Sequence, residues 1–133
     1  MLGKLTPEQL LTREDLAQKA KQYQADNEAI SQLSKITDEI KIVQITGLWC
    51  PDCIRDTPAL IAVLQRAANA NIKLEFIGVD RAKKAPNDAL ADYQFERIPT
   101  TIVMLNNQEV GRIVEKAQDS LEQDLFNIIK QAL

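Results

Sequence analysis

The sequence predicts an α/β fold in which a central mixed four-stranded sheet is flanked by helices. Runs rich in β-branched residues alternate with amphipathic stretches of helical period beyond residue 38. The last two β-like runs are separated only by Asn106 and Asn107, which suit a hairpin turn because asparagine tolerates positive φ. A strand–helix–strand unit followed by a hairpin and a final helix makes a mixed parallel and antiparallel sheet.

Residues 1–37 are expected to form a helical N-terminal extension. Thr6 is a suitable N-cap, Pro7 suits the first helical position, and Gln9 completes a capping box. Helical pattern continues beyond this start, and a second, shorter helix is expected over residues 28–35. The apolar stripes of both helices predict packing against the rest of the chain.

The remaining residues, 38–133, are expected to form the core of a single domain that spans residues 1–133, because the length is that of one domain. The predicted elements of this core, in order, are a strand over 40–46, a helix over 51–69, a strand over 72–79, a short helix over 87–93, strands over 100–105 and 109–114, and a helix over 120–133.

Composition excludes several classes of function. The net charge is −3 with acidic and basic residues mixed along the chain, so nothing indicates binding to nucleic acid or to anionic lipid. No apolar run has the length of a signal peptide or a membrane span. We therefore expect a monomeric cytoplasmic protein, unless a leader outside this sequence exports it. Histidine is absent, which excludes Ser-His and Cys-His nucleophile pairs and HExxH zinc sites.

The chemistry is expected at Cys50 and Cys53, the two cysteines of the chain. They form a CxxC pair where a predicted strand passes into a predicted helix, which is typical of a redox site. Zinc ribbons use the same spacing, but zinc needs further Cys or His ligands that the chain lacks. A zinc site shared between two chains or completed by carboxylates stays open; otherwise we expect neither metal nor cofactor.

The start of the helix predicts how the pair reacts. Cys50 is expected near the N-cap, where unpaired amides and the positive helix end favour its thiolate form. Cys53 is expected one turn later, deeper, and within reach of a disulfide. Pro51 suits the first helical position. Asp52 adds a like charge near Cys50, so we expect a moderately acidic thiol and a redox poise nearer to a reductant than to a strong oxidant.

These residues resemble the thioredoxin superfamily over about residues 40–133. Four features carry the resemblance: Trp49 directly before the CxxC pair, Pro58 where the active-site helix of the family commonly kinks, the Arg97-Ile98-Pro99-Thr100 segment that opens the third core strand, and the hairpin that ends at Gly111. The resemblance implies a thioredoxin-like fold with the N-terminal helices in place of the usual first strand.

The resemblance also implies roles. Cys50 would attack the substrate disulfide, and Cys53 would resolve the mixed disulfide. Pro99, in the cis form, would face the two cysteines.

Three further residues would contact the substrate. The backbone of Ile98 would pair with an extended substrate segment, and Thr100 belongs to the same substrate-binding loop. Trp49 would flank the site as a contact surface, although a packing role for its ring is equally compatible with the sequence.

The sequence also departs from thioredoxins proper. The residues between the cysteines are Pro-Asp rather than Gly-Pro, as in thioredoxin-related proteins with a WCPDC motif. Gln44 replaces a buried acid that helps to deprotonate the second cysteine, so resolution is expected to be slower or to use water or another carboxylate. Ile54 and Arg55 stand where a lysine is often found.

We interpret the chain as a thiol–disulfide oxidoreductase that reduces cytoplasmic protein disulfides, with disulfide-containing proteins and a thioredoxin-reductase-type electron donor as partners. Two alternatives stay open. The first is a thioredoxin-fold binding or chaperone-like module whose cysteines are dispensable. The second is an oxidase or isomerase, or a reductase of small-molecule disulfides.

Overall fold

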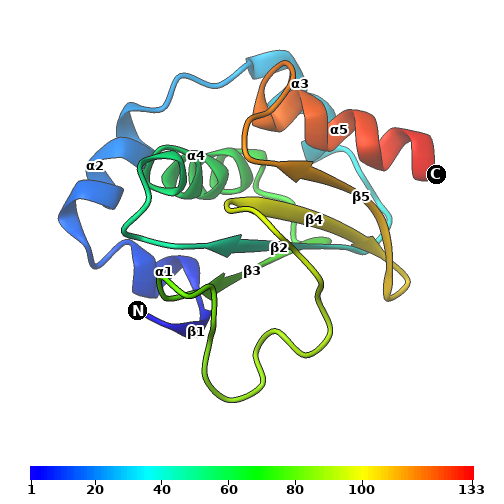
Figure 1. The fold of residues 1–133 in the computed structure, drawn as a ribbon. Helices are drawn as coiled ribbons and strands as arrows, with labels where there is room; N and C mark the ends of the chain where they lie inside the picture. The colour runs from blue at the N-terminus through cyan, green and yellow to red at the C-terminus, as the bar shows by residue number, and fades with distance from the viewer.

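The computed structural model describes residues 1–133, with five helices and one five-stranded sheet (Figure 1). The elements, in chain order, are β1 Gly3–Leu5, α1 Pro7–Leu10, α2 Glu14–Gln22, α3 Asn27–Ser34, β2 Ile40–Thr46, α4 Pro51–Ala67, β3 Ile72–Gly78, β4 Thr100–Leu105, β5 Gln108–Val114 and α5 Leu121–Ala132. No helix is both long enough and apolar enough to cross a bilayer.

The sheet confirms the predicted mixed α/β architecture. Its strand order is β1-β3-β2-β4-β5; β2 and β3 run parallel, and the other neighbours run antiparallel. The hairpin between β4 and β5 turns at Asn106 and Asn107, which have φ of 53° and 63°. These positive values match the turn chemistry that the two asparagines predicted.

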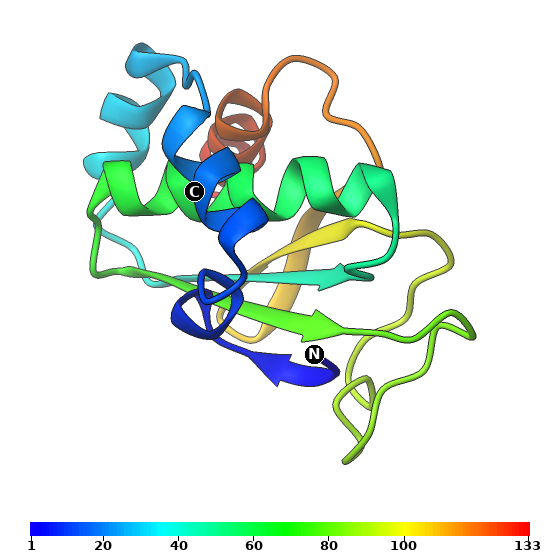
Figure 2. The same ribbon diagram turned by 90° about the vertical axis from the view of Figure 1, so that its left-hand side faces the viewer.

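The number of strands differs from the prediction. Residues Gly3–Leu5, expected within a helical extension, form β1 and pair antiparallel with the end of β3 (Figure 2). Three residues are too few to show an alternating pattern in the sequence, and this strand depends on a partner more than seventy positions away. The sheet therefore has five strands rather than four.

Helices α2, α3, α4 and α5 lie on one face of the sheet (Figure 1). Figure 1 shows α4 lying directly over the strands, with α2, α3 and α5 on the same side. The larger hydrophobic cluster fills this side, and it includes Leu16 of α2, Leu33 of α3, Leu60 of α4 and Leu125 of α5, all fully buried. This packing holds the N-terminal extension against α4.

The opposite face is covered by the segment over residues 79–99 instead of by a helix. The prediction of a short helix over residues 87–93 is wrong, because Asn87 and Asp88 have φ of 60° and 54°, outside the right-handed helical region. Ala89 is nevertheless buried in a second hydrophobic cluster. The apolar positions of this segment thus serve packing, while its backbone forms consecutive turns.

Candidate active site

Helix α4 begins directly after Cys50, which has the extended backbone of an N-cap, and Pro51 fills the first helical position. The Cys50 amide donates to the carbonyl of Gly47 at 2.9 Å, which shapes the turn between β2 and the helix. Cys50 is partly exposed and Cys53 is fully buried. The two thiols therefore have the unequal access that the sequence predicted.

Cys53 is buried as a neutral thiol. Burial raises its pKa to about 11, and the charge of the neighbouring Cys50 acts in the same direction. Two hydrogen bonds oppose this effect, one from the side chain of Thr46 and one from the backbone of Gly47. The Gly47 amide lies 3.3 Å from Cys53 Sγ. Donors aimed at the sulfur make a thiolate accessible there in spite of desolvation.

Trp49 packs its ring along the turn beside the cysteines. Its indole Nε1–H donates to the carbonyl of Val79 at 3.0 Å, and the Arg81 guanidinium lies 5.0 Å from the ring centroid. This cation–π contact covers one face of the ring. The ring joins the second hydrophobic cluster and is partly exposed. Both packing and a contact surface are thus compatible with its position.

Gly47 allows this close packing. A Cβ at this position would lie 2.7 Å from the ring of Trp49 and 2.8 Å from the side chain of Ile98. Only glycine lets the turn approach both side chains. The turn therefore brings Trp49 and Ile98 to the same place as the Cys53 sulfur, which Gly47 contacts through its amide.

The loop that opens β4 reaches the same end of the sheet. The Ile98–Pro99 peptide bond is cis, which is the isomer that the family resemblance implied. Ile98 is buried in the same cluster as Cys53, and Thr100 Oγ1 donates to the carbonyl of Arg97 at 2.6 Å. No hydrogen bond within the chain uses the backbone N–H or C=O of Ile98. These groups are free to pair with another extended chain.

Asp52 lies next to Cys50 with its charge paired. Arg55 Nη1 lies 3.2 Å from Asp52 Oδ1, and the same guanidinium forms two hydrogen bonds, of 2.8 and 2.9 Å, with the buried Asp56. The carboxyl of Asp56 is the main reason that the pKa of Arg55 is raised. Arg55, which had not been assigned to the site from the sequence, thus partly balances the negative charge of Asp52 near Cys50.

Pro58 lies inside α4 and is buried. Because proline has no backbone N–H, the carbonyl of Ile54 receives no helical hydrogen bond from position 58.

Gln44 lies in β2 below this part of the helix and is fully buried. Instead of a charged group, the structure places an amide here, hydrogen-bonded to Thr57 and Thr101. Sequence reasoning missed both threonines, although Thr57 lies one turn after Cys53 on the same helix face.

Arg13 also belongs to this neighbourhood. Its Nη1 donates to the carbonyl of Leu48 at 3.2 Å, while Asp15 holds the other side of the guanidinium. The N-terminal extension therefore contacts the turn that carries the cysteines. No pattern in the sequence indicated this contact, because it joins segments 35 residues apart.

Comparisons with known proteins agree with this geometry. A family model described as thioredoxin matches residues 5–124. A thioredoxin of Mycoplasmopsis pulmonis is 29% identical over 77 residues, which cover 57% of this chain and 71% of that protein. A Pseudomonas aeruginosa protein of unknown function shares the fold, with a TM-score of 0.70 and 21% identity over 92% of this chain and 86% of that chain. Thioredoxin O2 of Arabidopsis thaliana aligns with a TM-score of 0.50 and 16% identity over 79% and 84% of the two chains.

Proposed function

This chain belongs to the thioredoxin family, and on that premise we propose that it is a thiol–disulfide oxidoreductase that reduces protein disulfides through Cys50 and Cys53. One observation carries the proposal. A partly exposed thiol stands at the N-cap of α4, and a buried thiol lies one turn later with an amide directed at its sulfur. This is the arrangement that a nucleophile and a resolving thiol require.

The reaction proceeds in two exchanges. The Cys50 thiolate attacks one sulfur of the substrate disulfide, and the other substrate sulfur leaves with the electron pair. Cys53 then attacks the Cys50 sulfur, the second substrate sulfur leaves, and a disulfide closes between the two cysteines. The substrate gains two electrons and two protons, and the protein loses both. A thioredoxin-reductase-type donor in the cytoplasm restores the dithiol.

A protein substrate is supported by the surroundings of Cys50. The free backbone groups of Ile98 suit an extended peptide, because a strand-like segment forms hydrogen bonds with backbone groups that have no partner. Trp49 offers a partly exposed aromatic surface beside them. Pro99 and Thr100 hold this loop at the start of β4.

The test compares three proteins on one disulfide-bonded protein substrate: the wild type, Cys50→Ser and Cys53→Ser. We expect the wild type to reduce the substrate when a chemical dithiol regenerates it, and Cys50→Ser to be inactive. Cys53→Ser should form a covalent mixed disulfide through Cys50 and accumulate it, because nothing resolves the bond. Mass spectrometry of the trapped species identifies the sulfur that reacted.

A wild type that reduces no disulfide, together with a Cys53→Ser variant that traps none, would overturn the proposal and favour a binding module with dispensable cysteines. Equilibration in thiol–disulfide buffers separates a reductase from an oxidase or isomerase. A difference of 30 mV in potential corresponds to about 1.4 kcal/mol, so the classes are well resolved. We expect a potential on the reducing side.

A further inference from the structure

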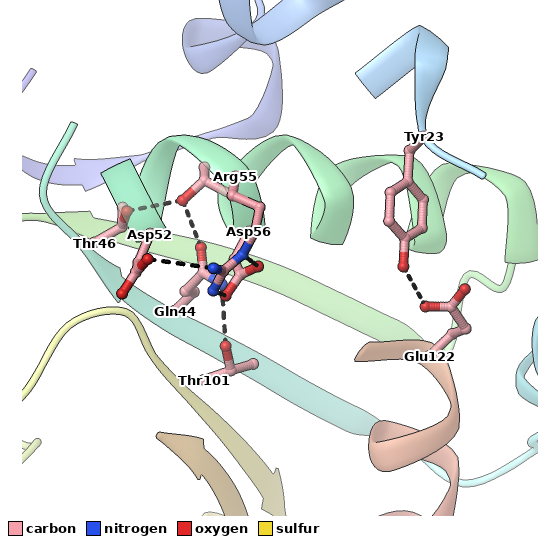
Figure 3. A network of polar contacts seen from close by, with 9 residues as sticks. Tyr23, Gln44, Thr46, Asp52, Arg55, Asp56, Thr101 and Glu122 are labelled. Atoms are coloured by element: carbon pink, nitrogen blue, oxygen red, sulfur yellow. Dashed lines mark hydrogen bonds and ion pairs between the residues drawn. The ribbon is translucent and has the colours of Figure 1, made fainter. Parts of the chain in front are cut away.

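A line of four polar side chains is buried between α4 and the sheet (Figure 3). Thr46 and Thr57 have their hydroxyl oxygens 2.8 Å apart, and Thr57 Oγ1 donates to Gln44 Oε1 at 2.7 Å. Gln44 Nε2 then donates to Thr101 Oγ1 at 3.0 Å. None of the four is more than 2% exposed, so these hydrogen bonds have no competition from water.

The line ends at the resolving thiol. Thr46 is the last residue of β2 and precedes Gly47, whose amide lies 3.3 Å from Cys53 Sγ. A hydrogen bond from the Thr46 side chain also lowers the pKa of the Cys53 thiol. Thr57 lies one turn after Cys53 on the same face of α4. Both threonines therefore connect Cys53 with Gln44.

The direction of these bonds follows from counting hydrogens. A hydroxyl has one hydrogen, and Thr57 uses it on Gln44 Oε1, so Thr57 must accept from Thr46. In this state Thr46 has used its own hydrogen and can only accept from Cys53, whereas the bond by which it lowers the pKa of Cys53 is the one that it donates to the thiolate. This arrangement fits the protonated thiol, whose S–H donates to Thr46.

The opposite direction fits the thiolate. If the Gln44 amide turns over, its N–H donates to Thr57, Thr57 donates to Thr46, and Thr46 donates to the Cys53 sulfur. The hydroxyl of Thr101 then donates to the Gln44 oxygen. An amide carries both donors and an acceptor, so one side chain supports both directions, whereas a carboxylate only accepts and an apolar side chain does neither.

We propose that Gln44, Thr57 and Thr46 form a reversible hydrogen-bond chain that serves the resolving thiol Cys53 in both of its protonation states. The inference rests on the proposed function, and it assigns the three residues as positioning residues for the second exchange. The chain itself stays neutral and gains no proton. It turns from acceptor to donor as the proton leaves the buried sulfur.

The attack of Cys53 on the mixed disulfide needs no further group to balance its protons. The Cys53 sulfur bonds to the Cys50 sulfur, and the bond between Cys50 and the substrate breaks with its electron pair on the substrate sulfur. The proton lost by Cys53 balances the one gained by the released substrate thiol. Cys50 is the titratable group that acts on Cys53. The other neighbours of the Cys53 sulfur, from β2 and the cis-proline loop, are apolar or neutral. The carboxylates of Asp52 and Asp56 on α4 face Arg55.

The experiment measures the two exchanges separately with an aromatic disulfide reagent whose released thiolate is coloured. Attack by Cys50 releases the first coloured thiolate, and resolution by Cys53 releases the second. Thr46→Val and Thr57→Val keep the side-chain shape and remove the hydroxyl, while Thr46→Ser and Thr57→Ser keep the hydroxyl. Gln44→Met removes the amide at the end of the chain. Rates are recorded against pH, and the melting temperature of each variant reports folding.

We expect the valine and methionine variants to slow the second release about tenfold at neutral pH and to move its pH profile upward by about one unit, since a hydrogen bond to a charged group has that magnitude. The first release should not change, and serine should restore the second. Valine variants that resolve at the wild-type rate would overturn the inference, as would serine variants as slow as the valine variants. A wild type that releases no second thiolate would instead contradict the proposed function, so the two failures are distinguishable.

Discussion

The hydroxyl of Tyr23 donates to the carboxylate of Glu122 at 2.6 Å, and these residues lie 99 positions apart in the sequence (Figure 3). The second oxygen of Glu122 accepts from the amide of Asp26 at 2.7 Å. Glu122 is fully buried in the first turn of α5, and both bonds are partly buried. Through these two hydrogen bonds, Glu122 connects the segment between α2 and α3 to the C-terminal helix α5.

Replacing Tyr23 by phenylalanine should destabilise the fold. The variant keeps the ring and leaves one oxygen of a buried carboxylate without its donor. We expect the free energy of unfolding to fall by about 2 kcal/mol, the magnitude of a hydrogen bond to a charged group. Denaturant unfolding measures it. Tyr93→Phe is the matched control, because Tyr93 lies in the segment on the opposite face of the sheet and should lose less. Equal losses in the two variants would contradict this role.

The same hydrogen bond makes stability depend on alkaline pH. Burial raises the pKa of Tyr23, and the Glu122 carboxylate raises it further. Because the folded pKa lies above the unfolded value of about 10, the native state holds its proton longer than the unfolded state does. The stabilisation is therefore complete below about pH 10 and is lost as the pH rises from there toward the folded value.

Unfolding experiments on the wild type and Tyr23→Phe across this range provide the measurement. The difference in stability between the two should stay constant at neutral and mildly alkaline pH and shrink above about pH 10. A difference that remains constant through strongly alkaline pH would show that the Tyr23 hydroxyl is not the group that titrates.

Much of the site could be predicted because its chemistry is local. Cys50 and Cys53 are three positions apart, so the strand-to-helix transition alone fixes which is exposed and which is buried. The hairpin at Asn106 and Asn107 was predictable for the same reason, because positive φ is a property of the asparagines themselves.

The remaining features depend on contacts between distant segments. Strand β1 exists through pairing with the end of β3, and Gln44 reaches Thr101 because β2 and β4 place these two residues opposite each other. A threonine in a strand pattern is ordinary in a sequence, since its β-branched side chain favours strands whatever its hydroxyl does. Only the register of the sheet shows that the hydroxyl of Thr101 lies within reach of the Gln44 amide.

The two thiols should differ strongly in reactivity. Cys53 is fully buried and its pKa is about 11, so at neutral pH it is almost entirely a thiol, and the thiolate is the reactive form. We expect a small alkylating reagent to modify the reduced native protein once, at Cys50, as read by mass spectrometry of its peptides. In denaturant both cysteines should react. Two native adducts formed at similar rates would contradict the burial of Cys53.

Gly47 packs closely against the indole of Trp49 and against Ile98 of the cis-proline loop, so Gly47→Ala should disturb the turn, the indole and the loop. The added Cβ would meet Trp49 at 2.7 Å and Ile98 at 2.8 Å, which forces side chains or backbone to move. We expect a loss of about 1–3 kcal/mol in unfolding free energy, the usual cost of overpacking. Trp49 is the single tryptophan, so its fluorescence emission reports the displacement directly.

Gly111→Ala is the matched control for this prediction. Its added Cβ would lie 2.5 Å from Ile128 Cγ2 of α5, so it should also destabilise the protein. Gly111 lies in β5, however, and pairs with Val103 rather than with the turn at the cysteines. We therefore expect both variants to lose stability, while Gly47→Ala alone shifts the emission of Trp49 and slows the reaction of Cys50. An emission shift of equal size in Gly111→Ala would mean that Trp49 reports general loosening of the fold rather than its contact with Gly47.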